Sequence, residues 1–382
     1  MKVKFLNTLS CGINANNHIR SFKNNRIKEQ KEKKMIHRRS ASAHLLPQQT
    51  HSNVFQTKDE NITGKDPMNS SWSGSPESFK SLIGGRRYHL MLRLPAVAGQ
   101  FYAGTRKDLL REIEKCFLDS SRGPGALPEI GGKEGLKGVV VPHAGYMFSG
   151  AIAAHSYMEI AKNGLADVYI IIGPNHTGMG SGVSVYPSGK WRTPLGDVEI
   201  NTEIVKKLSG GIIDVDESAH MYEHSAEVQV HFLQYMHGGE KKFTIVPICM
   251  AMQDYETSKE VGNAIGDVIK ESEEKIMVIA SSDFSHVGFH YFEHPPSGKR
   301  VDEYAKEQDE KAIEAILNID PKLLIERVEK YRISMCGYGC VASMLVAAKN
   351  LGAEKGILLK YGNSYEVIPS DSCVGYGAIA IY

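Results

Sequence analysis

Three runs of apolar, mostly β-branched residues stand out along the chain because no polar residue alternates within them. They cover residues 138–141, 168–172 and 276–280, and a histidine soon follows each run: His143, His176 and His286. Such runs are typical of strands buried on both faces of a sheet that helices cover. Since ligands bind at the carboxyl ends of strands in open α/β sheets, we expect three strands to bring three histidines to one edge.

Helical spacing of apolar residues predicts most of the elements between these strands. Thr105 and Asp108 form a capping-box pattern that begins one helix. Residues 191–196 are interpreted as a turn. We expect further helices near residues 151–160, 203–210, 223–237, 258–270, 302–317, 321–330 and 340–350, and strands near 243–248, 356–361 and 374–382. Because helices and strands alternate without an internal linker, the pattern predicts a single α/β domain over residues 91–382.

Residues 1–90 differ from the rest in composition. A basic cluster between Lys23 and Arg39 leads into a segment rich in Ser, Asn and Gln. Such a sequence buries too little apolar surface to offset the entropy of ordering it, so we predict a disordered basic and polar extension. The alternatives are a mis-assigned start, with Met91 as the first residue, an organellar transit peptide and a nucleic-acid-binding arm.

Composition narrows the function classes. The formal net charge of the 382 residues is +1 at pH 7, which gives no global attraction to nucleic acid or membranes, and no apolar run approaches the roughly 18 residues that a membrane helix needs. Six scattered cysteines favour reduced thiols and a cytoplasmic location over a disulfide scaffold. No P-loop, dinucleotide fingerprint or Gly-x-Ser-x-Gly elbow occurs, which argues against nucleotide-binding enzymes and serine hydrolases.

The strand-end histidines are candidate metal ligands. One histidine in such a place is more often structural, but several donors converging from separate elements are what a metal site needs. His143 and His176 are the first-choice ligands, and Cys336 is the candidate third donor, with Cys340 or Glu227 as its replacement. Two imidazoles and a thiolate suit Fe²⁺, Zn²⁺ or copper.

Two further groups are candidates for supporting chemistry. Asp283 and His286 lie three residues apart after the third strand, so His286 could act as acid or base with Asp283 orienting it; a structural turn is the alternative. His224, Glu227 and His231 would fall on one face of the helix expected from residue 223. They would then either support the metal ligands through hydrogen bonds or form a solvated polar face.

The motif series resembles the Memo family, most closely its prokaryotic members in the AmmeMemoRadiSam group. The resemblance runs from about residue 92 to the end of the chain. It is carried, in chain order, by Pro-Ala-Val-Ala-Gly-Gln-Phe-Tyr at 95–102, Val-Pro-His-Ala-Gly-Tyr at 141–146, Gly-Pro-Asn-His at 173–176, Arg-Thr-Pro-Leu-Gly at 192–196, Glu-His-Ser-Ala-Glu-Val-Gln at 223–229, Ser-Ser-Asp-Phe-Ser-His at 281–286 and Cys-Gly at 336–337.

This resemblance implies a three-layer αβα sandwich around a mostly parallel or mixed sheet, as in class III extradiol non-haem iron dioxygenases. By motif, His143 and His176 fill the two histidine positions of that iron site, His286 matches the acid/base histidine, and Cys336 stands where those enzymes have a carboxylate. A soft, oxidisable thiolate argues against catechol-type oxygenation.

The expected cofactor is Fe²⁺, with copper or Zn²⁺ as alternatives. The expected function is a redox or oxygen-dependent reaction on an unknown small molecule or peptide. The alternative is a non-catalytic protein that binds a peptide or partner in a degenerate dioxygenase crevice.

Overall fold

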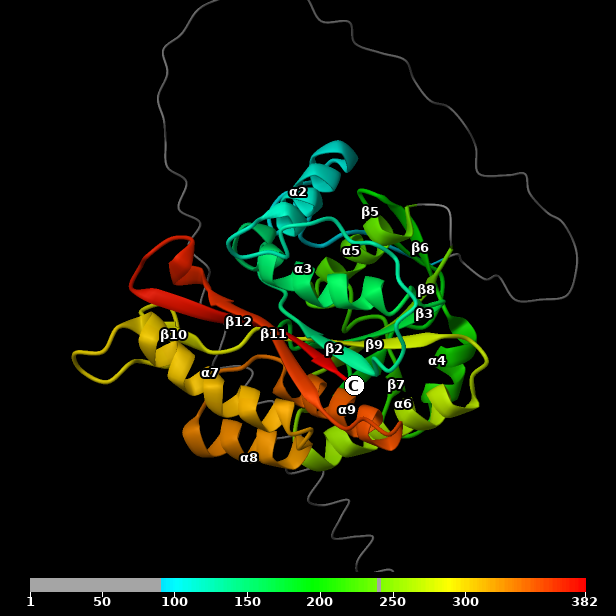
Figure 1. Ribbon diagram of the computed structural model, residues 1–382. Helices are drawn as coiled ribbons and strands as arrows, with labels where there is room; N and C mark the ends of the chain where they lie inside the picture. Colours follow the sequence, from blue (N-terminus) through cyan, green and yellow to red (C-terminus); the bar gives the residue numbers. More distant parts are fainter. Residues whose placement is uncertain (1–90, 239–241) are drawn as a thin grey trace, which may run out of the picture. The chain divides into compact units, whose positions relative to one another are not determined.

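A mixed sheet of 12 strands runs through residues 91–238 and 242–382, which are the residues that this computed structural model describes (Figure 1). These residues belong to one compact unit. The extension that we predicted for residues 1–90 lies outside the described residues.

The strands follow the order β1-β5-β6-β8-β3-β9-β2-β12-β10, with β11 on β12 and β4 bridging β7 and β8. Their bounds are β1 Leu92–Arg93, β2 Gly138–Val141, β3 Val168–Pro174, β4 Val183–Val185, β5 Lys190–Thr193, β6 Gly196–Ile200, β7 Asp214–Val215, β8 Thr244–Met250, β9 Ile276–Ser281, β10 His286–Gly288, β11 Gly356–Asn363 and β12 Ser372–Ile381.

The three apolar runs form neighbouring parallel strands at the centre of the sheet. β9 lies between β3 and β2 and pairs with both in parallel, and β8 pairs in parallel with the other side of β3. Every residue of β2 and β3 is buried, because helices cover both faces. The carboxyl ends of β2, β3 and β9 therefore meet at one edge, as the apolar runs predicted.

Helices form a layer on each side of the sheet. On one side α2 (Arg106–Leu118), α3 (Tyr146–Lys162) and α5 (Glu227–His237) pack together, and on the other α9 (Tyr338–Asn350) packs against α6 (Tyr255–Glu271) and α8 (Pro321–Tyr331) (Figure 1). α4 (Thr202–Leu208) contacts α6, while α7 (Val301–Leu317) contacts α8 and β12. The predicted three-layer αβα sandwich around a mixed sheet is thereby confirmed.

Several local predictions can be checked directly. Thr105 caps α2 as expected, since its hydroxyl oxygen accepts the Asp108 amide at 3.3 Å. The expected turn at residues 191–196 is instead a hairpin of β5 and β6, which turns between Thr193 and Gly196. None of the helices among residues 91–238 and 242–382 combines the length and apolar character needed to cross a bilayer.

The helix expected from residue 223 was placed too early, because α5 begins only at Glu227. The carboxylate of Glu223 accepts the amides of His224 and Ser225 at 2.9 and 2.8 Å. These two bonds hold the chain in a turn ahead of the helix, so Glu223 and His224 do not share a helical face with the residues that follow.

Candidate metal centre

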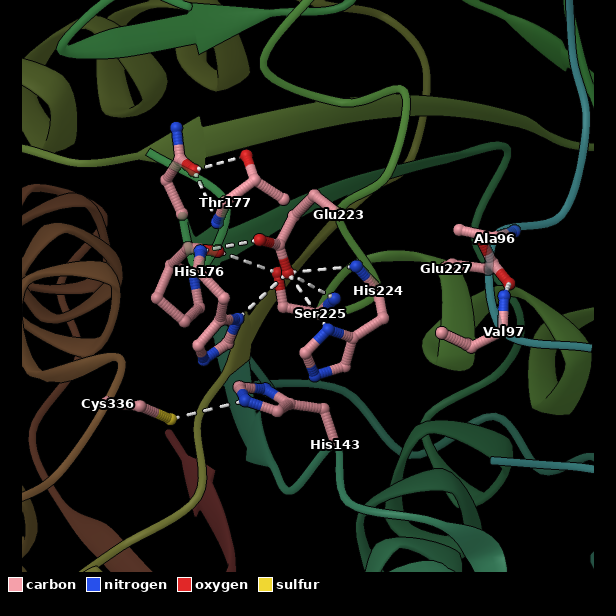
Figure 2. A network of polar contacts seen from close by, with 12 residues as sticks. Ala96, Val97, His143, His176, Thr177, Glu223, His224, Ser225, Glu227 and Cys336 are labelled. Atoms are coloured by element: carbon pink, nitrogen blue, oxygen red, sulfur yellow. Dashed lines mark hydrogen bonds and ion pairs between the residues drawn. The ribbon is translucent and has the colours of Figure 1, made fainter. Parts of the chain in front are cut away.

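Two strand ends and one helix start deliver the three candidate ligands to the same place. His143 follows β2, His176 follows β3, and Cys336 lies just before α9. One ligand atom from each of the three lies within 4.8 Å of the others, and Cys336 Sγ is 3.2 Å from His143 Nε2 (Figure 2). The structure thus brings together all three residues that the sequence singled out.

The ring of His143 is oriented by a hydroxyl that can only accept its proton. Ser281 Oγ donates its one hydrogen to the Ser225 carbonyl at 2.6 Å and accepts an amide hydrogen from Gln229 at 2.7 Å. His143 Nδ1 lies 2.9 Å from the same oxygen, so Nδ1 carries the hydrogen. The lone pair of the neutral ring is therefore on Nε2, the nitrogen that faces Cys336.

The ring of His176 is oriented by a carboxylate. Its Nδ1 donates to Glu223 Oε1 at 2.9 Å, and its backbone amide donates to Glu223 Oε2 at 2.6 Å (Figure 2). Together with the amides of His224 and Ser225, four hydrogens point at this one carboxylate. His176 Nε2 is thus left for the centre. This carboxylate–histidine arrangement is the usual support of a metal-binding imidazole.

The ionisation of the three candidate ligands is strongly perturbed. Burial lowers the pKa of His143 well below its ordinary value, and the neighbouring charge of His176 adds to that effect. Burial would also lower the pKa of His176, but hydrogen bonds with Cys336 and Glu223 outweigh it and raise that pKa to about 10. Burial raises the pKa of the Cys336 thiol, although its hydrogen bond with His176 opposes this. A metal entering the site must displace protons from His176 and Cys336.

A third imidazole, that of His224, packs beside the centre. Its ring stacks on His176 with centroids 4.7 Å apart, and it meets His143 edge-on at 5.5 Å. The Phe101 ring also packs on His224, with centroids 4.7 Å apart. Burial and the charge of His176 lower the pKa of His224 to about 4, so the ring is neutral at physiological pH.

The expected polar face of His224, Glu227 and His231 does not exist. His224 precedes the helix, Glu227 binds Arg93, and the His231 ring packs on Tyr102 with centroids 4.0 Å apart. Only His224 contacts the centre. The error follows from extending the helical spacing through the turn that Glu223 enforces.

Asp283 and His286 both lie at this edge, but their partners differ from the expected ones. Asp283 Oδ1 accepts the His143 amide at 2.7 Å, and the Asp283 amide donates to Cys336 Sγ at 3.3 Å. His286 Nδ1 donates to the Ser334 carbonyl at 3.0 Å. Ser334 therefore orients His286, whereas Asp283 holds the turn after β2 against the candidate thiolate. The expectation that Asp283 orients His286 is corrected on this point.

The two alternative donors lie outside the candidate centre. Cys340 is fully buried within α9 and does not belong to either of the donor clusters that the described residues form. Glu227 accepts Arg93 Nη1 at 2.5 Å. It also accepts the amides of Ala96 and Val97 (Figure 2). Neither residue is available to the centre in this arrangement.

The sequence did not reveal three residues that orient the histidines: Glu223, Ser281 and Ser334. Glu223 and Ser281 stand inside recognised motifs, yet spacing gave no reason to pair them with His176 and His143. Their partners lie 47 and 138 residues away. A search for one carboxylate or hydroxyl per proposed metal-binding histidine would have found these two.

Comparison with known proteins places the described residues in one family. The Memo-like protein family matches residues 93–380. A MEMO1 family protein of Methanopyrus kandleri is 47% identical over 293 residues, 76% of this chain and 98% of that protein. Another from Methanosarcina mazei is 45% identical over 76% of this chain and 99% of that protein. Among solved structures, the uncharacterized protein JW3007 of Escherichia coli K12 has a TM-score of 0.41 and 15% identity, covering 64% of this chain and 99% of that one.

Proposed function

This chain belongs to the Memo-like family, and from that premise we propose that it binds a metal through His143, His176 and Cys336 and uses it in a redox or oxygen-dependent reaction. The observation that carries the proposal is the pair of oriented rings. Both Nδ1 atoms donate to fixed acceptors, so both Nε2 atoms are presented to one sulfur.

The donor set fits a borderline or soft metal. Two imidazole nitrogens and a thiolate suit Fe²⁺, copper and Zn²⁺ better than Mg²⁺ or Ca²⁺, which prefer oxygen. We take iron as the first choice, with copper or zinc as alternatives. Bound iron or copper would supply Lewis acidity and one-electron chemistry at a coordination position left open by only three protein ligands.

Two residues beside the centre, His286 and Asp283, would assist that chemistry. The Ser334 carbonyl holds Nδ1–H of His286, which leaves Nε2 as the nitrogen that would take up or return a proton of a bound substrate. Asp283 lies between the backbone of His143 and the sulfur of Cys336. It therefore fixes the spacing of two ligands, and burial raises the pKa of its carboxyl group.

Access to the centre supports an enzyme over a closed structural metal site. The side chain of His176 is 35% exposed, whereas structural sites usually enclose four protein ligands. The substrate would be a small molecule or a peptide. A protein that contains no metal would instead support the non-catalytic alternative, in which the same crevice binds a peptide or partner.

The test is metal analysis after anaerobic purification under reducing conditions. We expect about one metal ion per chain, and we expect His143→Ala, His176→Ala and Cys336→Ala each to reduce Fe²⁺ affinity by at least 100-fold, since two donors remain. Cys340→Ala is the matched control for the thiol and His286→Ala for the imidazole, and both should keep the metal. Unchanged Fe²⁺ affinity in Cys336→Ala would reject the proposed ligand set.

A further inference from the structure

We propose that Arg93 is a positioning residue of the metal centre, which acts through Glu223 on His176. The inference rests on the proposed metal function, but its geometry stands apart from any bound ion. It also gives a role to the motif at residues 95–102, which the proposed chemistry does not use.

Arg93 lies in β1, at the edge of the sheet, yet its side chain is completely buried. Three of its nitrogens each reach a different acceptor. Nε donates to the His220 carbonyl at 2.8 Å, Nη2 donates to the Glu223 carbonyl at 2.6 Å, and Nη1 donates to the Glu227 carboxylate at 2.5 Å. Its guanidinium also lies over the Trp191 ring, 4.2 Å from the centroid. A planar fork with fixed donors is what this arrangement requires.

The two carbonyl contacts fix both ends of the loop from His220 to Glu223. Its last residue supplies the carboxylate that accepts the amide and the Nδ1 hydrogen of His176. The path from the guanidinium to the proposed metal ligand therefore contains one backbone carbonyl, one side chain and one ring. A displacement of Glu223 would turn the His176 ring, because nothing else in the described structure binds its Nδ1.

Glu227 compensates the buried charge and joins the N-terminal stretch to the same network. Its carboxylate accepts the amides of Ala96 and Val97 (Figure 2). It also accepts the hydroxyl of Tyr102. Burial opposes ionisation of Glu227, but the charge of Arg93 and these hydrogen bonds lower its pKa. Removing Arg93 alone would leave the buried carboxylate of Glu227 without a compensating charge, which is strongly destabilising.

Variants of this network can distinguish an effect of Arg93 on the position of His176 from a general effect on stability. Arg93 donates hydrogen bonds to both the Glu223 loop and Glu227, whereas the hydrogen bond of Tyr102 in the described part of the chain goes to Glu227. Tyr102→Phe should therefore lower stability and leave the centre unchanged. Arg93→Lys keeps the charge but can satisfy fewer of the three acceptors, and Arg93→Met with Glu227→Gln removes both charges so that no lone buried charge is left.

Two measurements test the proposal: titration with Co²⁺ followed by its visible and thiolate charge-transfer absorption, and nitrogen NMR of the His176 ring in the metal-free protein. In Arg93→Met/Glu227→Gln we expect about tenfold weaker Co²⁺ binding, a shifted visible spectrum and loss of the protected Nδ1 hydrogen of His176. Arg93→Lys should restore these properties in part. Tyr102→Phe should match the wild type in both measurements while its melting temperature falls.

The outcomes are separable from those of the proposed function. A folded Arg93→Met/Glu227→Gln variant with wild-type Co²⁺ affinity, spectrum and His176 resonances would overturn the positioning role. If the wild type itself fails to bind Co²⁺, the proposed function fails, while the NMR of the metal-free protein still decides whether Arg93 orients His176. If the double variant does not fold, Arg93→Lys decides: wild-type resonances of His176 in that variant would contradict the requirement for a guanidinium.

Discussion

Two buried carboxyl groups on the two sides of the candidate centre have pKa values that are shifted in opposite directions. Glu223 holds His176, a proposed ligand, and hydrogen bonds from His176 overcome its burial and lower its pKa to about 2. Asp309, in α7, accepts the Ser285 amide at 2.8 Å next to His286, and burial raises its pKa to about 7. The metal side thus rests on a fixed charge, and the acid/base side on a group that titrates near neutrality.

The number and kind of donors explain the difference. Four hydrogens reach the Glu223 carboxylate, one of them from a ring that is charged in the metal-free protein. Asp309 accepts the Ser285 amide and the Tyr361 hydroxyl, neither of which is charged, and the Ser285 side chain also favours its ionisation. The negative charge of Glu293 adds to the effect of burial. A buried carboxylate stays ionised only when enough donors replace its water. The comparison therefore predicts different responses to amide substitution and to pH.

The largest expected effect is that of Glu223→Gln on metal binding. Glutamine accepts through one oxygen, so its amide group would face a backbone hydrogen that Glu223 now accepts, and His176 would lose its charged partner. We expect metal affinity to fall about 10- to 100-fold, measured by Fe²⁺ titration under anaerobic conditions. Asp309→Asn is the matched control and should keep wild-type affinity. Equal losses in the two variants would show that the carboxyl groups do not differ in role.

Asp309→Asn should change how stability depends on pH. The folded pKa of about 7 lies above the ordinary 3.8, so the folded chain holds a proton that the unfolded chain releases between these values. Stability should therefore fall as the pH rises from about 4 to 7 and level off above it. We expect the variant to lack this contribution, roughly 1–3 kcal/mol, in urea unfolding at pH 4.5 and 7.5. Parallel pH profiles for the two proteins would refute it.

The sequence sufficed for the parts of this arrangement that depend on the sheet. Unbroken apolar runs predicted β2, β3 and β9, and parallel strands have their carboxyl ends at one edge, so the proximity of His143 and His176 followed. Cys336 could be placed there only as a candidate, because no strand carries it. The shortest strands, such as β1, contain too few residues for a periodic signal.

What the sequence could not predict is the hydrogen bonding that distinguishes one histidine from another. The helical spacing of residues 223–237 is real, but the carboxylate of Glu223 competes for the amides that would begin the helix. Arg93 is 130 residues from the carbonyl of Glu223, and no spacing rule links an edge strand to a loop so far away. Asp309 likewise lies in a helix with several other acidic residues, so its sequence position does not indicate that it is buried.

A smaller effect is expected from Ser281→Ala, which tests the other ligand ring. Without the hydroxyl, His143 Nδ1 loses its acceptor and the ring can adopt the other tautomer, which turns a hydrogen toward Cys336. We expect metal affinity to fall about tenfold, less than in Glu223→Gln because no charge is removed. Ser285→Ala, a buried serine of the same motif, is the control. A loss of metal affinity as large as that of Glu223→Gln would mean that the charge of Glu223 does not make it more important for metal binding than Ser281.

The smallest effect is expected from Tyr361→Phe, which removes one hydrogen-bond donor to Asp309. The Tyr361 hydroxyl lies 2.7 Å from Asp309 Oδ2 and favours the ionised carboxyl group. Its loss should raise the pKa of Asp309 further, so the fall in stability with rising pH would extend to a higher pH than in the wild type. We expect a change of about 0.5–1.5 kcal/mol, the usual contribution of one hydrogen bond. Urea unfolding between pH 6 and 9 measures it, with Tyr235→Phe, whose hydroxyl faces Glu114, as the control. If the fall in stability ended at a lower pH than in the wild type, hydrogen-bond donors would not explain why the pKa values of Glu223 and Asp309 differ. That difference would then have to come from burial alone.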